Sequence, residues 1–169
     1  RANEVARALR ERVAAAGLDE VVASVEEPLA RTEDTLFGGE SRVGNFVADA
    51  YRWATGADVA LQNSGGIRSG DPIRGAVTVA DLVSLLPFEE PVAVAELSGE
   101  RLRAALRQAV DGSLGFAEDG WFHAHVSGAE LAWDRDAGTV EVVRVDGEPL
   151  DPSATYTVAT SDYLLHTDD

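Results

Sequence analysis

The sequence predicts an α/β domain in which helices pack on a mixed β-sheet. In the N-terminal part of the chain, segments with helical periodicity alternate with short apolar runs typical of buried strands. In the C-terminal part, strand-like runs follow one another directly. The chain has 169 residues, of which 45% are hydrophobic, and this is enough to bury the core of one domain.

The N-terminal segment is expected to be a short amphipathic helix over residues 3–16, because its apolar residues recur at helical spacing. We interpret residues 1–19 as a linker helix from an upstream domain and residues 20–169 as the domain itself. Residues 21–25 indicate a strand. Residues 28–39 show no periodicity, so they are expected to form a connection.

The strongest helix signal starts at Val43, with apolar residues at positions i, i+3, i+4, i+7, i+8 and i+11. Ser41 precedes this helix, and Gly56 stands just past its end. A buried strand over 58–62 should follow. It leads into residues 63–68, a loop with two adjacent glycines.

The middle of the chain carries a second set of helix signals. Residues 78–81 have the form of a capping box and predict a short helix through Ser84, which must end before Pro87. A strand over 92–97 and a helix over 98–110 should follow.

The last segments indicate a loop and several strands. We expect a loop over 112–120 and strands over 131–133, 140–145 and 156–160. Asp146-Gly147 indicates the turn that precedes the last strand.

The composition is strongly acidic. Lys and Arg number 14 against 30 Asp and Glu, which gives a net charge of −16, and every basic residue is Arg. Such a surface argues against a nucleic acid duplex as partner, because no basic stripe is present to release counterions. Carboxylates that hold water and cations are typical of proteins adapted to concentrated salt. The alternative is an ordinary acidic protein from a genome that favours Arg codons.

Cysteine is absent, so a disulfide framework, a Cys-ligated zinc site and a cysteine nucleophile are all excluded. No apolar run approaches the roughly 18 residues that a membrane-spanning helix needs. The charged, Ala-rich start does not resemble a signal peptide.

Catalytic motifs are weak in this chain. Neither a nucleophile elbow nor a phosphate-binding glycine loop occurs. His123 and His125 would share one face of an extended segment, but no third metal ligand is fixed nearby, so we interpret them as polar or partly buried imidazoles. His166 gives no stronger signal. We therefore expect no catalytic residue and no metal site in this chain.

Binding signals are stronger. The loop Asn63-Ser64-Gly65-Gly66-Ile67-Arg68 exposes backbone N–H groups beside a guanidinium, which suits an anionic or polar ligand, although such a turn can also be purely structural. Phe88 follows a proline in a polar loop, where a planar base could stack on it, and Tyr163 has the same potential. Either ring could instead fold back under its loop.

Several motifs in one order carry a family resemblance. They are Gly39-Glu40-Ser41-Arg42-Val43-Gly44-Asn45-Phe46-Val47-Ala48-Asp49-Ala50, 54–60, 63–68, 78–88, 96–102 and 147–152 followed by 156–160. Together they resemble the C-terminal, substrate-binding domain of the 5′-nucleotidase family over about residues 20–169. In that family an N-terminal metallophosphoesterase domain holds two divalent metal ions and performs hydrolysis, while the C-terminal domain binds the nucleoside.

The resemblance implies a set of binding residues. Phe88 and Tyr163 would sandwich the base, and Arg68 would contact the phosphate side. The residues expected to bind substrate are Phe88, Tyr163, Arg68, Asn63, Gly65, Gly66, Arg42 and Asp169. These roles suit the chemistry, because aromatic faces bind any base, a carboxylate accepts from a ribose diol, and Arg offers a planar fork to phosphate.

The sequence differs from the family pattern at three places, and each difference affects one of these assignments. Arg42 would substitute for an arginine that the family often carries a few residues earlier. Glu89-Glu90 replaces an amide that can read a base edge, which leaves the base preference open. The ending His166-Thr167-Asp168-Asp169 replaces Asn-Gly-Gly-Asp, which affects the assignment of Asp169 to the ribose hydroxyls.

The resemblance implies the nucleotide-binding domain of a periplasmic, extracellular or cell-surface enzyme that hydrolyses nucleoside 5′-phosphates to nucleoside and phosphate. The expected partners are a nucleotide or nucleoside and the N-terminal metallophosphoesterase domain, which would supply the metal ions. One alternative is a stand-alone binding or interaction module with the same fold and no hydrolysis. Another is a family member that acts on a different phosphoester, such as a cyclic nucleotide, a nucleotide sugar or a sulfur-oxidation intermediate.

Overall fold

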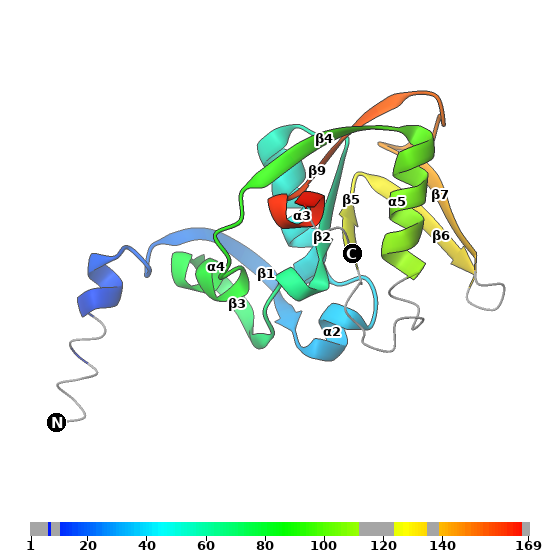
Figure 1. The fold of residues 1–169 in the computed structure, drawn as a ribbon. Coiled ribbons are helices and arrows are strands. Elements are labelled where there is room, and N and C mark those ends of the chain that lie inside the picture. The colour runs from blue at the N-terminus through cyan, green and yellow to red at the C-terminus, as the bar shows by residue number, and fades with distance from the viewer. Residues whose placement is uncertain (1–6, 8–10, 112–123, 135–138, 167–169) are drawn as a thin grey trace.

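The computed structural model describes residues 7, 11–111, 124–134 and 139–166 (Figure 1). Its helices and strands alternate along most of the chain. The elements are β1 (Val21–Arg31), α2 (Glu33–Phe37), α3 (Arg42–Thr55), β2 (Val59–Asn63), the 3₁₀ turn η1 (Ser64–Gly66), β3 (Gly70–Thr78), α4 (Val79–Leu85), β4 (Val92–Ser98), α5 (Gly99–Asp111), β5 (Ala124–Ser127), β6 (Ala129–Asp134), β7 (Thr139–Val145), β8 (Glu148–Pro149), β9 (Thr155–Ser161) and α6 (Asp162–His166).

The central sheet has the strand order β4-β9-β2-β5. Strands β2 and β9 are parallel, with Val59 opposite Val158 and Ala60 opposite Ala159. The outer pairs β4–β9 and β2–β5 are antiparallel. The sheet is therefore mixed, as predicted. Two smaller sheets accompany it, β1-β3 and β6-β7-β8.

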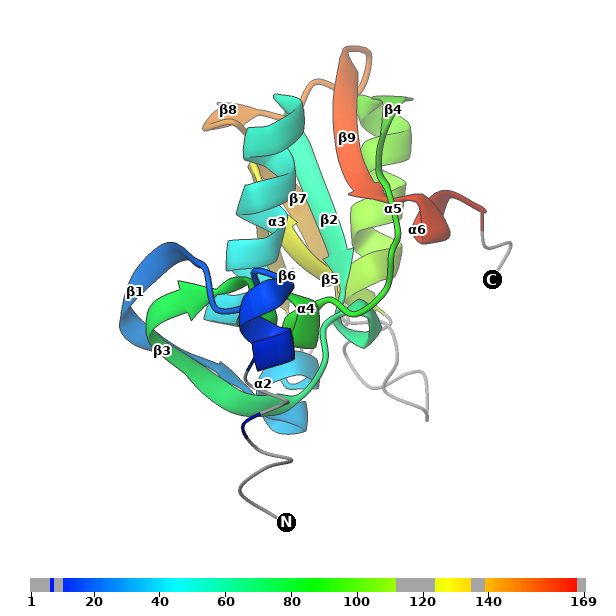
Figure 2. The same cartoon turned by 90° about the vertical axis from the view of Figure 1, so that its left-hand side faces the viewer.

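The two faces of the central sheet carry side chains of different size, because successive residues of a strand point to opposite faces. Val59 and Val158 face one core together with Leu102 and Leu106 of α5. The neighbouring residues on β2 and β9 are alanines, which pack with Ala48 and so let α3 approach the other face. Helices α3 and α5 accordingly lie on opposite sides of β2 and β9 (Figure 2).

A third core lies where α3 meets the β1–β3 pair. Its buried side chains come from five elements and from the residues that join them: Leu29, Leu36, Val43, Val47, Ile67, Ile73, Val77 and Leu85. This core fixes the β1–β3 pair and α4 against the start of α3. It thereby positions the chain on both sides of the loop 63–68.

The helix caps agree with the sequence prediction. Ser41 Oγ accepts a hydrogen bond from the Gly44 N–H at 3.1 Å at the start of α3, and Gly56 ends this helix in the left-handed conformation at φ +69°. Thr78 and Asp81 form the complete capping box of α4. Asp146 and Gly147 both have positive φ, as a tight hairpin turn between β7 and β8 requires.

Residues 28–39 differ from the expected connection, because they contain the end of β1 and the short helix α2. Strand β1 pairs with β3 through three irregularities of register, which disrupt the alternation that a strand normally shows in sequence. Strands β3, β5 and β8 and helix α6 were likewise not predicted, and the turn at Asp146-Gly147 leads to β8 before the last strand. The loop expected over 112–120 lies outside the described residues.

The segment before β1 contacts the body of the domain. Residues 11–15 are helical, as expected for that part of the first predicted helix. The Val79 N–H donates to the Glu20 carbonyl at 3.0 Å, and the Ala80 N–H donates to the Leu18 carbonyl at 2.8 Å. Among the described residues, no helix is both long and apolar enough to cross a membrane.

Candidate functional site

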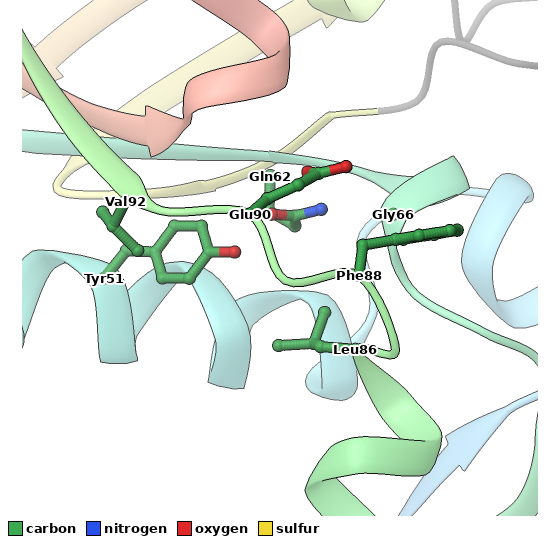
Figure 3. A pocket seen from close by; sticks show the side chains of 7 residues that line it. All are labelled: Tyr51, Gln62, Gly66, Leu86, Phe88, Glu90 and Val92. Atoms are coloured by element: carbon green, nitrogen blue, oxygen red, sulfur yellow. The ribbon is translucent and has the colours of Figure 1, made fainter.

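A pocket of about 140 Å³ lies where the segment 86–92 passes over Tyr51 of α3 and the end of β2 (Figure 3). Its volume is close to that of protein cavities that hold a single aromatic ring. Seven residues line it: Tyr51, Gln62, Gly66, Leu86, Phe88, Glu90 and Val92. Two of them, Gly66 and Phe88, are among the residues expected to bind substrate.

Phe88 is presented by the turn that follows α4. Its ring is 45% exposed, so it does not fold back into the core. The guanidinium carbon of Arg68 lies 4.6 Å from the centroid of the Phe88 ring, which is a cation–π contact. The Arg68 N–H donates to the Leu85 carbonyl at 2.9 Å, and this bond ties the loop 63–68 to the end of α4.

Tyr163 lies on α6, immediately after β9, and is 52% exposed. Strands β4 and β9 pair with Val92 opposite Ser161, and the Asp162 N–H donates to the Pro91 carbonyl at 2.8 Å. The segments that carry Phe88 and Tyr163 are therefore held together by main-chain hydrogen bonds, although Tyr163 does not line the pocket. The sandwich of a base between the two rings stays a prediction.

The glycine loop packs tightly against Gln62. Asn63 Oδ1 accepts a hydrogen bond from Gln62 Nε2 at 3.0 Å, so the Asn63 side chain orients its neighbour. A Cβ added to Gly66 would lie 2.2 Å from Gln62 Nε2, and only glycine fits there without displacing this amide. Gly65 belongs to the same 3₁₀ turn.

The remaining predicted residues are Arg42 and Asp169. Arg42 forms an ion pair with Glu27 of β1, at the start of α3, and does not line the pocket. Asp169 lies outside the described residues. A contact of either residue with a ligand stays a prediction.

The sequence interpretation did not assign five of the seven lining residues to a binding site, and three of these five are polar: Tyr51, Gln62 and Glu90. Tyr51 was assigned to the apolar face of its helix, and Gln62 to a buried strand. Burial raises the pKa of the Tyr51 hydroxyl, and the Glu90 carboxylate raises it further, so this hydroxyl keeps its proton. Glu90 was noted, with Glu89, as the replacement of an amide that can read a base edge, but it was not assigned to a pocket. No local signal could have shown that these residues share one pocket.

A buried histidine is hydrogen-bonded to the glycine loop. His125 of β5 is 1% exposed, and its Nε2 lies 3.1 Å from Ser64 Oγ. The Ser64 hydroxyl also donates to the Leu36 carbonyl at 2.5 Å, so Ser64 links the imidazole to the residues before α3. His125 is thus fully buried and hydrogen-bonded to Ser64, whereas His123 lies outside the described residues.

A buried arginine holds the other side of the same loop. Arg31 is 6% exposed and donates to the Asp71 carbonyl at 2.8 Å, to the Arg68 carbonyl at 3.3 Å and to Ser84 Oγ at 3.1 Å. It therefore links β1 to the loop that carries Arg68 and to α4. In the described part of the chain, no group of three or more His, Cys, Asp or Glu side chains could hold a metal ion.

Fold and pocket together define an α/β domain whose pocket is lined by an aromatic side chain in contact with a guanidinium. Residues 21–169 match the family described as 5′-nucleotidase, C-terminal domain, and the chain belongs to this family. The resemblance seen in the sequence is thereby confirmed.

Relatives and solved structures agree with this assignment. The chain is 31% identical over 171 residues to an apyrase of Tabanus yao, covering 88% of this chain and 30% of that protein. It is 32% identical over 127 residues to endonuclease YhcR of Bacillus subtilis, covering 75% of this chain and 10% of that protein. The structure of a 5′-nucleotidase precursor from Thermus thermophilus superposes with a TM-score of 0.75 at 30% identity, over 95% of this chain and 33% of that chain. The chain thus spans a third or less of the length of these proteins.

Proposed function

We propose that this chain is the substrate-specificity domain of a larger metallophosphoesterase that hydrolyses nucleoside 5′-phosphates to nucleoside and phosphate. The observation that carries the proposal is the exposed Phe88 ring beside a ring-sized pocket, with the Arg68 guanidinium in contact with it. A base can stack on such a ring, and a guanidinium beside it can bind the phosphate end of the same ligand.

Hydrolysis would be the work of an N-terminal metallophosphoesterase domain. Two divalent metal ions bound there would supply a metal-activated water, and this chain would hold the nucleoside in place. We place the full protein in the periplasm, outside the cell or on its surface. Similarity to a 5′-nucleotidase described as a precursor supports a location outside the cytoplasm.

The exact phosphoester is a second question. The chain is 30% identical over 137 residues to a trifunctional nucleotide phosphoesterase, YfkN of Bacillus subtilis, a match that covers 74% of this chain and 9% of that protein. This similarity favours a nucleotide substrate. It is compatible with a nucleoside 5′-phosphate and equally with a cyclic or other phosphoester of a nucleoside. A stand-alone module with the same fold and no ligand is the alternative function.

Isothermal titration calorimetry of the chain with AMP and adenosine tests the proposal. We expect both to bind, and we expect no phosphate release from AMP by this chain with or without divalent metal ions. Phe88→Ala and Tyr163→Ala should each weaken binding, by about 1–3 kcal/mol for a lost stacking contact. Trp53→Ala is the matched control, because Trp53 is 88% exposed on α3 and does not line the pocket.

Three results would contradict the proposal. Binding of neither ligand would favour the stand-alone module. Unchanged affinity of the Phe88→Ala, Tyr163→Ala double variant for AMP and adenosine would show that the two rings do not bind the ligand. Phosphate release at an enzymatic rate by this chain would contradict the division of labour between the two domains.

A further inference from the structure

The pocket beside Phe88 contains a polar set that the stacking of a base does not explain. Gln62, Tyr51 and Glu90 line it together with apolar side chains. In Figure 3 the Tyr51 hydroxyl points toward the side of the pocket where Gln62 and Glu90 lie. A ligand inside the pocket would therefore meet one hydroxyl, one amide and one carboxylate.

The orientation of the Gln62 amide is fixed by its own hydrogen bonds. Its Nε2 donates to the main-chain carbonyl and to the side-chain Oδ1 of Asn63, both at 3.0 Å. Rotation of the amide would place Oε1 against these two oxygens, so the observed orientation is the favourable one. Gln62 is 2% exposed, and its Oε1 has no hydrogen-bond partner among the described residues.

A buried acceptor without a partner is rare in folded proteins and indicates a missing donor. Because Gln62 lines the pocket, a ligand in the pocket is the natural source of this donor. Glu90 adds a second acceptor, since its exposed carboxylate can only accept when ionised. Tyr51 can supply a donor, because its hydroxyl remains protonated.

We propose that this pocket reads the edge of a 6-oxopurine and makes the domain selective for guanine nucleotides; this inference rests on the proposed nucleotide-binding function. A guanine edge presents the O6 acceptor, then N1–H, then the N2 amino group. Tyr51 donates to O6, and Gln62 Oε1 and the Glu90 carboxylate accept from N1–H and the N2 amino group.

Adenine presents the reverse pattern at the corresponding positions. Its N6 amino group can donate to the Tyr51 hydroxyl oxygen, so the mismatch falls on N1, an acceptor that faces other acceptors. Stacking on Phe88 does not distinguish the two purines, because every base has an aromatic face. Discrimination must therefore come from the pocket, and the carboxylate of Glu90 is the strongest acceptor in it.

Calorimetric titration with GMP, AMP and IMP separates these contributions, since the three ligands share ribose and phosphate. We expect GMP to bind roughly tenfold more tightly than AMP, as one well-placed pair of base contacts provides. IMP lacks the N2 amino group, so it should fall between the two. Glu90→Gln should remove most of this preference, chiefly because GMP binds more weakly.

Glu89→Gln is the matched control, because Glu89 is also exposed and undergoes the same change of charge without lining the pocket. Equal effects of Glu89→Gln and Glu90→Gln would overturn the role of Glu90 as a base-reading residue. AMP binding as tight as GMP would overturn guanine selectivity while leaving nucleotide binding intact. Binding of no nucleotide would overturn the proposed function and this inference together.

Discussion

The guanidinium of Arg68 stacks on the ring of Phe88, with 4.6 Å between the guanidinium carbon and the ring centroid. The two side chains come from separate loops, which are joined by the bond from the Arg68 N–H to the Leu85 carbonyl. A cation on one side of the ring pre-orients both groups, and Phe88 still remains 45% exposed.

The contact between Arg68 and Phe88 predicts that the Arg68 charge and the Phe88 ring bind different parts of the ligand. Arg68→Met should weaken AMP binding by about tenfold or more, because a charge-assisted hydrogen bond to phosphate is lost. Adenosine has no phosphate, so its affinity should fall much less. Titration of both ligands against the variant measures the difference, and an equal loss for AMP and adenosine would place Arg68 away from the phosphate.

Arg31 is expected to act as a positioning residue for Arg68. Its side chain is 6% exposed and bonds the Arg68 carbonyl and two further oxygens, so Arg31→Ala should lower the free energy of unfolding by about 2 kcal/mol or more. Urea unfolding measures this loss. Arg74→Ala is the control, because Arg74 is exposed on the paired strand β3.

Arg31→Lys tests whether the planar fork matters beyond the charge. Lysine keeps the charge but cannot bond three oxygens in the same geometry. We expect this variant to remain folded and to bind AMP more weakly while adenosine binding changes little. Wild-type affinity of Arg31→Lys for AMP would show that the loop holds Arg68 without Arg31.

The contact of α3 with β5 depends on a glycine. A Cβ at Gly44 would lie 1.9 Å from Cγ of His125, and the imidazole is buried and bonded to Ser64. Gly44→Ala should therefore lower the free energy of unfolding by at least about 1–3 kcal/mol through overpacking. Thermal and urea unfolding measure this loss, with Ala50→Ser on the exposed side of the same helix as the control. Equal stability of Gly44→Ala and wild type would contradict this packing.

Local signals explain which elements could be predicted. Ser41, Gly56 and the capping box at Thr78 act within a few residues, so the bounds of α3 and α4 follow from the sequence. Strand β1 could not be predicted in full, because most of its side chains are exposed and its pairing with β3 is irregular. Its existence depends on a partner that lies far along the chain.

The candidate site, like the fold, could be predicted only in part from the sequence. Phe88, Arg68 and the glycine loop belong to contiguous motifs, and the structure places Phe88 and Gly66 in one pocket, with Arg68 against the Phe88 ring. Gln62 and Tyr51 were assigned to the core by periodicity, which cannot distinguish a residue that faces the core from one that faces a buried pocket. Only the packing of the segment 86–92 over α3 brings them together.

The acidic composition predicts a response to salt. With a net charge of −16, the free energy of unfolding should rise as KCl screens repulsion, but screening alone is nearly complete by about 1 M, where the Debye length is about 3 Å. A protein adapted to concentrated salt should gain further stability between about 1 and 3 M KCl. Urea unfolding at these concentrations distinguishes adaptation from a preference for Arg codons, since the latter predicts a plateau.

Acid should weaken the link between β2 and β9 through Asp58. The Thr157 N–H and hydroxyl both donate to Asp58 Oδ2 at 2.7 Å, and these bonds lower the pKa of the Asp58 carboxyl. A carboxyl with a lowered pKa stabilises the fold fully above its unfolded pKa of about 4, and this stabilisation is lost as pH falls through the lower folded value. The difference in free energy of unfolding between wild type and Asp58→Asn should therefore be constant from about pH 5 to 7 and shrink below about pH 4. Urea unfolding across this range checks the prediction, with exposed Asp19→Asn as the control. A difference that stays constant down to about pH 3 would show that the Asp58 carboxylate does not hold the strands through its charge.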